Sequence, residues 1–205
     1  ADGIHVLTGG VDGTARLCAM ATGECDLVFT GHNGAVNATM YSDDGRLVFT
    51  GGQDGIVRAW DRATGEKRGK FVGHKREIKA LCYGAHGQSF LSSGGDNTLI
   101  HWDLKSGAQL GAIHSFQSPL LAISVSNDRR YLLAGSKDGF LEYIDLTSGK
   151  RLGRRRGHSE PVAAVCISKR GQFALTGGHK GKVRLWETSG HRCLFTYKAY
   201  APIAV

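Results

Sequence analysis

The chain has 205 residues, 41% of them hydrophobic and 21% charged, which excludes the composition of a disordered protein. Its 30 glycines accompany only 3 prolines and follow no three-residue period, so they indicate turns between many short strands and exclude collagen. The formal net charge of +8 is compatible with acidic partners, such as nucleic acid or an acidic protein surface, and does not distinguish among them.

Short β-rich runs alternate with turns along the chain. Residues 46–51 and 56–61 predict two strands that flank a turn at residues 53–55. A turn at residues 63–65 then leads to a third strand near 66–72, and residues 77–83 give a fourth. Four antiparallel strands in a unit of this length are typical of one blade of a β-propeller. We therefore expect an all-β fold with hardly any helix.

A Gly-His pair recurs with a constant period. Gly31-His32 and Gly73-His74 are 42 residues apart, and Gly157-His158 follows after twice that interval. Ser115-Phe116 stands where the missing copy would be. The period divides the chain into units at about 1–30, 31–72, 73–114, 115–156 and 157–198, with the start of a further strand at 199–205.

Two other repeat positions keep the same register. A tryptophan recurs at Trp60, Trp102 and Trp186, with Ile144 and Cys18 in the remaining units. The acidic residue of the turn between the second and third strands of each unit recurs in four units and is replaced by a lysine in the fifth. These residues are Asp12, Asp54, Asp96, Asp138 and Lys180.

Taken together, the Gly-His pairs, the S/T-G-G-x-D-G turns and the x-W-D strands resemble the WD-repeat family over essentially the whole chain. The resemblance implies a hydrogen-bonded set of Trp, Ser/Thr, His and Asp in each complete blade. Mapped by motif, the sets are His32, Thr50, Asp54 and Trp60; His74, Ser92, Asp96 and Trp102; and an incomplete set of His158, Thr176 and Trp186.

The number of blades leaves two alternatives. About five blades are present, and the resemblance implies a seven-bladed ring of which this chain is a part, beginning within the second strand of its first blade. The alternative is a closed ring of five blades, in which Pro202 to Val205 would pair with Gly3 to Gly9.

Two units depart from the full set of polar residues. One has Phe116, Ala134 and Ile144 in place of the three partners of its aspartate, an exchange that costs little when both members of a buried hydrogen bond are removed together. The other keeps His158 but has Lys180 at the acidic position, so we expect its imidazole to meet solvent or another acceptor.

The polar residues of these sets are also of the types found in catalytic sites. Ser92, His74 and Asp96 have the residue types of a hydrolytic triad, but the same set recurs in another unit in register with a tryptophan. Such repetition indicates a structural role, and no Walker loop, dinucleotide fingerprint, nucleophile elbow or metal-ligand spacing is present. We therefore expect no enzyme, no cofactor and no metal.

Partner binding is expected on loops and on one outer strand. The loops before the first strand and between the second and third strands share one face, called here the first face. A second, more basic face carries the other two sets of loops. Candidate contacts of the first face are Gln53, Lys75, Arg76, Glu77, Lys137, Glu160, His179 and Lys180. The candidate outer strand carries Arg154, Arg155 and Arg156, which could equally guard a strand edge.

These features favour a non-catalytic scaffold that binds other proteins within an intracellular assembly. The alternative is an RNA-associated propeller that uses the basic face, although aromatic residues do not alternate with the basic ones as base stacking would need. No membrane contact is expected, because no apolar run has the length of a span and the first ten residues do not resemble a signal peptide. The five cysteines lack a C-x-x-C pair, so free thiols in a reducing compartment are expected, in a cytoplasmic, nuclear or cytoskeletal assembly.

Overall fold

The computed structural model describes residues 3–83, 87–168 and 170–198. These residues form 19 strands in five antiparallel sheets. The first three sheets, which we call the first to third blades, contain β1 (His5–Gly9), β2 (Thr14–Ala19) and β3 (Cys25–Thr30); β4 (Val36–Tyr41), β5 (Leu47–Gly52), β6 (Ile56–Asp61) and β7 (Lys67–Val72); and β8 (Ile78–Tyr83), β9 (Ser89–Gly94), β10 (Thr98–Asp103) and β11 (Gln109–Ser115). The fourth and fifth blades contain β12 (Leu120–Val125), β13 (Tyr131–Ser136), β14 (Phe140–Asp145) and β15 (Lys150–Arg156), and β16 (Val162–Ile167), β17 (Phe173–Gly178), β18 (Lys182–Glu187) and β19 (Arg192–Lys198).

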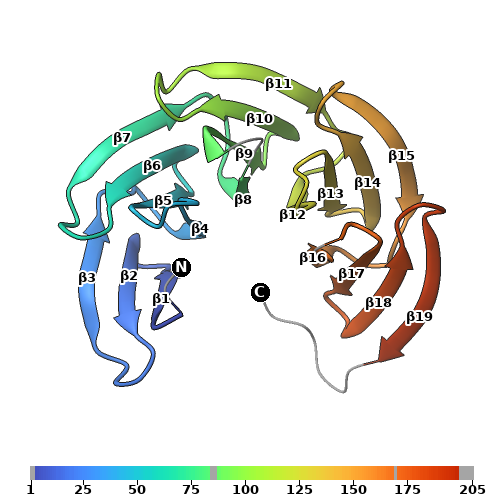
Figure 1. Cartoon of the computed structure of the whole chain (residues 1–205), viewed down its shortest axis with the longest axis horizontal. Helices are drawn as coiled ribbons and strands as arrows, with labels where there is room; N and C mark the ends of the chain where they lie inside the picture. The colour runs from blue at the N-terminus through green and yellow to red at the C-terminus, as the bar shows by residue number, and fades with distance from the viewer. Residues whose placement is uncertain (1–2, 84–86, 169, 199–205) are drawn as a thin grey trace.

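The five blades follow one another around an arc, as Figure 1 shows. Within each blade the strands lie in chain order, so each sheet is an antiparallel meander of sequence neighbours. The innermost strands contact one another in series, from β1 to β4, β8, β12 and β16. The prediction of an all-β fold made of propeller blades is confirmed, with three strands in the first blade and four in each of the others.

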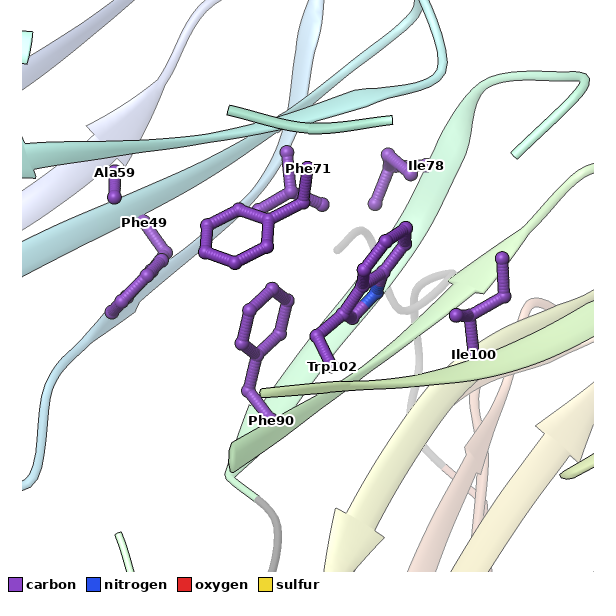
Figure 2. Packing of buried hydrophobic residues seen from close by; sticks show 8 residues of the cluster. Phe49, Ala59, Phe71, Ile78, Phe90, Ile100 and Trp102 are labelled. Atoms are coloured by element: carbon purple, nitrogen blue, oxygen red, sulfur yellow. The ribbon is translucent and has the colours of Figure 1, made fainter. Parts of the chain in front are cut away.

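The hydrophobic core is divided into layers between successive blades. One layer joins Phe49 and Phe71 of the second blade to Phe90 and Trp102 of the third (Figure 2). The Phe71 and Phe90 rings meet edge to face with their centroids 4.8 Å apart, an arrangement that aromatic quadrupoles favour. Three further layers of the same kind lie between the other pairs of neighbouring blades.

Glycine allows neighbouring blades to approach closely at one repeat position. A Cβ atom on Gly51 would lie 2.5 Å from Cγ2 of Ile78 in the next blade, and a Cβ on Gly135 would lie 2.5 Å from Cγ1 of Val162. A side chain at either position would push the blades apart. The third blade differs, since it has Ser93 at this position, and the buried Ser93 hydroxyl donates to the Leu120 carbonyl of the next blade at 3.0 Å.

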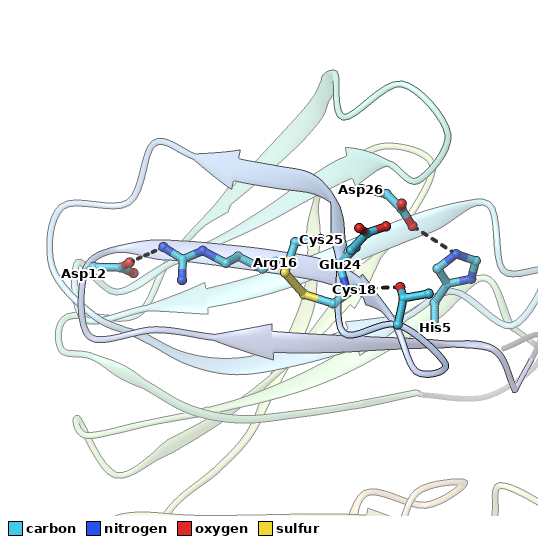
Figure 3. The surroundings of a disulfide bond; sticks show 8 residues. His5, Asp12, Arg16, Cys18, Glu24, Cys25 and Asp26 are labelled. Carbon is cyan, nitrogen blue, oxygen red and sulfur yellow. Dashed lines mark hydrogen bonds and ion pairs between the residues drawn. A yellow bond between two sulfur atoms is a disulfide. The ribbon is translucent and has the colours of Figure 1, made fainter.

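Two expectations have a different outcome. Cys18 and Cys25 form a disulfide between β2 and β3, so the expectation that all cysteines are free thiols is wrong (Figure 3). The two cysteines are paired across the antiparallel hairpin, which brings them together without any C-x-x-C spacing.

The suggested pairing of Pro202 to Val205 with the first strand lies outside the described residues. The described part of the chain has no helix capable of crossing a membrane.

Candidate interaction surfaces

The second and third blades each contain a continuous hydrogen-bonded set of four side chains. In the third blade the indole N–H of Trp102 donates to Ser92 Oγ at 2.7 Å, Ser92 Oγ lies 2.8 Å from Nε2 of His74, and Nδ1 of His74 lies 3.0 Å from Asp96. The corresponding distances in the second blade are 2.8, 2.7 and 3.0 Å for Trp60, Thr50, His32 and Asp54. Each set ties the turn that carries the aspartate to the strand that carries the tryptophan.

In the second blade the electrostatics favour a neutral imidazole beside an ionised carboxylate. Burial lowers the pKa of His32, and the nearby Arg58 charge lowers it further, against the opposing effect of Asp54. Burial raises the pKa of Asp54, but hydrogen bonds from the Asn33 N–H, His32 and Arg58 outweigh this and leave it below its ordinary value. The Arg58 guanidinium, which lies 2.8 Å from Asp54, completes the pairing.

The fifth blade keeps three of the four side chains. Trp186 donates to Thr176 at 2.9 Å, and Thr176 lies 2.7 Å from Nε2 of His158. His158 is only 1% exposed, so the expectation of contact with solvent is wrong. Its Nδ1 has no hydrogen-bond partner among the described residues, and the carboxylate of Glu160 is 3.8 Å away. Burial, together with the charge of Arg184, lowers the pKa of His158.

In the fourth blade apolar side chains occupy the place of the polar set. Phe116, Ala134 and Ile144 are buried together in the layer between the third and fourth blades. The turn aspartate that remains, Asp138, pairs instead with Arg154 of the outer strand at 2.8 Å. The substitutions therefore remove the partners as a group and leave no buried imidazole or indole N–H behind.

The positions of Ser92, His74 and Asp96 do not suit a hydrolytic triad. The Ser92 hydroxyl is fully buried and shared between Trp102 and His74, so it has no room for a substrate carbonyl. The described residues also contain no group of three or more His, Cys, Asp or Glu side chains that could hold a metal ion.

Six of the eight candidate residues of the first face are exposed, and two are not. Lys75, Arg76, Lys137, His179 and Lys180 are exposed, as is Gln53, whose Oε1 accepts from the Ala35 N–H at 3.2 Å. Glu77 is half-buried and pairs with Lys79 at 3.0 Å. Glu160 is only 5% exposed, so the expectation that it contacts a partner is wrong. Its carboxylate lies beside His158, close to the place that the missing turn aspartate would take.

The three arginines of the outer strand differ in their contacts. Arg154 donates to Glu142 at 3.0 Å and pairs with Asp138, and its guanidinium lies 3.7 Å from the centre of the Phe140 ring. These contacts link β15 to β14 and to the turn before it. The expectation that the Arg154 side chain is free for a partner is therefore wrong. Arg155 and Arg156 remain exposed.

A surface feature that the sequence analysis missed lies on the basic face. The structure has a pocket of about 590 Å³ between the fourth and fifth blades, called here the C-pocket. A second pocket of about 630 Å³ occupies the equivalent place between the first and second blades, called here the N-pocket. One signal could have drawn attention to the C-pocket: His191 stands at a repeat position that is glycine in the other four units.

The fold and the enclosed polar sets define a β-propeller repeat protein whose blades present loops to solvent. Comparison with protein families agrees: the model of the WD domain, G-beta repeat, matches residues 23–61, 65–103, 109–145 and 149–187. The chain therefore belongs to the WD40 repeat family. Repeats of this family generally mediate protein–protein interactions and are typically not enzymatic. No curated protein matches the chain.

The four matches are offset from the sheets. The match over residues 23–61 covers β3 of the first blade and β4, β5 and β6 of the second. Each sequence repeat therefore supplies the outer strand of one blade and the three inner strands of the next, which links neighbouring blades covalently as well as by packing.

Proposed function

We propose that the chain is a non-catalytic scaffold that binds protein partners through the exposed loops of its first face, as part of a multiprotein assembly inside the cell. One observation carries the proposal. The triad-like side chains are enclosed in the blades, whereas the loops of the first face present exposed cations such as Lys75, Arg76 and Lys180. A rigid platform with accessible charged loops is suited to recognition.

The charges favour a partner with an acidic surface. Lys75, Arg76, Lys137 and Lys180 form no ion pair with any described residue, so a partner's carboxylates could pair with them without displacing an internal contact. Such rim charges raise the association rate and contribute to specificity more than to affinity. An RNA-associated role through the basic face remains the competing proposal, and nuclease treatment distinguishes the two.

An intracellular location is proposed on the same basis as the function. Cys82, Cys166 and Cys193 are free, and the Cys166 side chain is exposed, which favours a reducing compartment. The Cys18–Cys25 disulfide is the one feature of the cysteines that points the other way.

The test is affinity capture from an extract of the source cells, with and without nuclease. We expect the wild-type chain to retain specific proteins after digestion, and a Lys75→Glu/Arg76→Glu variant to lose them because two exposed cations are reversed. An Arg46→Glu variant provides a control, since its charge change lies on the opposite face. Capture that disappears with nuclease would favour the RNA alternative, and equal capture by both variants would overturn the role of the first face.

A further inference from the structure

The C-pocket has the size and position of a binding site. Its volume of about 590 Å³ lies within the range of pockets that hold small ligands or one anchoring side chain. The pocket is formed by the turns of the fifth blade at residues 170–173 and 187–191 and by strands β14 and β15 of the fourth. It opens on the basic face, away from the first-face loops.

The chain departs from its own repeat around this pocket. His191 takes a left-handed conformation, with φ of 51°, at a position where Gly23, Gly65, Gly107 and Gly149 have φ between 67° and 75°. A side chain there costs roughly 1 kcal/mol relative to glycine. Its imidazole packs edge to face on the Tyr143 ring, with centroids 3.9 Å apart.

The two neighbouring wall positions depart as well. Tyr143 stands where the other blades have Leu17, Ala59, His101 and Leu185. Arg170 stands at the position that Asp44 and Asp128 occupy in the equivalent turns. Three departures from the repeat therefore meet at one pocket.

The pocket wall is apolar but contains one unsatisfied hydrogen-bond donor. Leu152 is 53% exposed and Phe173 is 42% exposed, so both offer apolar surface at the pocket. Tyr143 is only 6% exposed, and its hydroxyl has no hydrogen-bond partner among the described residues. Burial raises the pKa of Tyr143 to about 12, so the hydroxyl stays protonated and could donate to a ligand oxygen.

The charges at the pocket favour an anionic ligand. Arg170 is exposed and forms no ion pair within the described part of the chain, whereas the one lining carboxylate, Glu187, already has Arg192 at 3.6 Å. Burial and the nearby charge of Arg155 lower the pKa of His191, so its imidazole is neutral at pH 7. The unbalanced charge is therefore positive.

The N-pocket shows that size alone does not produce these features. It is slightly larger, yet its polar side chains satisfy one another: His5 pairs with Asp26 at 3.1 Å, and Arg62 donates to His5 at 3.2 Å. Where the N-pocket has Asp26 at its wall, the C-pocket has Leu152 at the same repeat position. The N-pocket is thus a matched control within the same molecule.

We propose that the C-pocket binds an acidic peptide segment of a protein partner, with one apolar side chain against Leu152 and Phe173 and a carboxylate on Arg170. The inference rests on the proposed function as a protein-binding scaffold and assigns it a second, independent contact on the opposite face. An apolar anchor supplies most of the binding energy, and the carboxylates fix the register.

The test uses fluorescence anisotropy with two labelled dodecapeptides of Asp, Glu and Ser, one with a central Leu and one with Ser in its place. We expect the Leu peptide to bind the 205-residue chain at least tenfold more tightly than the Ser peptide. Phe173→Ser should abolish that difference, and Arg170→Glu should weaken the Leu peptide about tenfold. Arg46→Glu, which places the same charge change at the N-pocket, should alter affinity less than twofold.

Several outcomes would overturn the site. Equal binding of both peptides to the wild-type chain, or an unchanged preference in Phe173→Ser, would do so, with circular dichroism showing that the variants are folded. If Phe173→Ser does not fold, Leu152→Ser tests the opposite wall. A single-stranded RNA that loses affinity in Phe173→Ser, while both peptides fail to bind, would also overturn the peptide assignment.

The result is separable from that of the proposed function. If proteins are captured equally well by the wild-type chain and by the C-pocket variants while the peptides fail, this site is wrong and the scaffold function stands. If neither face retains any protein, the proposed function itself is wrong.

Discussion

The third and fourth blades solve the same structural problem with opposite chemistry. The third blade ties its turn to its strands with the buried polar set of His74, Ser92, Asp96 and Trp102. The fourth fills the equivalent space with Phe116, Ala134 and Ile144, which are buried in one apolar layer. The two sheets nevertheless have the same strand order and closely similar register. The comparison teaches that the polar set can be replaced as a group without changing the blade, because no donor or acceptor is then left alone.

The largest effect is expected when one member of the polar set is removed. Ser92→Ala takes away the shared partner of Trp102 Nε1 and His74 Nε2, and two unsatisfied buried groups should lower the free energy of unfolding by about 2–4 kcal/mol. The fourth blade offers the reverse exchange as a control. Ala134→Ser would bury a hydroxyl with no imidazole or indole to bond, and we expect a loss of about 1–3 kcal/mol. Urea denaturation measures both, and a neutral Ser92→Ala would contradict the role of the set.

Conversion of the whole set should cost less than that single change. In the triple variant His74→Phe/Ser92→Ala/Trp102→Ile the third blade acquires the residues of the fourth. We expect a loss of about 1–2 kcal/mol, below that of Ser92→Ala alone, because both ends of the Trp102–Ser92 and Ser92–His74 bonds are removed together. Asp96, which the variant keeps, still accepts from Thr98 and from the Lys75 N–H. Denaturation of the three single variants and the triple variant completes the comparison. If the loss in the triple variant equals the sum of the three single losses, the three side chains contribute independently and the expectation is wrong.

The pH dependence of stability should also separate the blades. Burial lowers the pKa of His158 in the folded state below that of the unfolded chain, so the unfolded state binds the proton more readily. Its contribution is complete above about pH 6.5 and is lost as the pH falls below that value, by at most about 1.4 kcal/mol per pH unit. His158→Phe, which gives the fifth blade the residue of the fourth, should flatten the profile of unfolding free energy between pH 7 and 5. An equally steep profile in this variant would assign the loss to other groups.

The smallest effect is expected from completing the fifth set. Lys180→Asp in a Glu160→Gln background would supply the acceptor that His158 Nδ1 lacks, without leaving two carboxylates side by side. The gain in unfolding free energy over Glu160→Gln alone should be about 1 kcal/mol. Lys137→Asp makes the same charge change in the fourth blade, where no imidazole is present, and should leave the melting temperature nearly unchanged. If both substitutions shift it equally, the effect is one of net charge.

Much of the fold was predictable because the repeat constrains it. The turn at residues 53–55 and its flanking runs predicted β5 and β6 to within one residue, since glycine and aspartate mark the turn and alternate apolar residues mark the strands. The hydrogen-bonded residues were predictable for the same reason. The Trp, Ser/Thr, His and Asp positions recur in a constant register, which indicates that these side chains contact one another in each complete blade.

The exceptions arose where contacts cross between strands or units. Arg154 was assigned to the surface because its partner Glu142 stands at a repeat position that holds no acid in the other four units. Glu160 was assigned to an exposed loop. Its carboxylate is buried because it lies near the space left by the turn aspartate, which is replaced by Lys180 in this unit. The Cys18–Cys25 bond follows from the pairing of β2 with β3, which shifts register beside Cys18. The C-pocket was not predicted because side chains from two neighbouring blades form it together.

The serial contact between inner strands has a consequence for how the molecule folds. Each blade is built from consecutive residues and packs mainly against the blades before and after it, although Arg129 of the fourth blade also pairs with Asp43 of the second. The described chain therefore approximates a one-dimensional array in which stability is largely a sum of blade and interface energies. Folding could begin at any complete pair of blades and spread in both directions. The interface between the second and third blades, with its four aromatic rings, is the strongest candidate for that starting point.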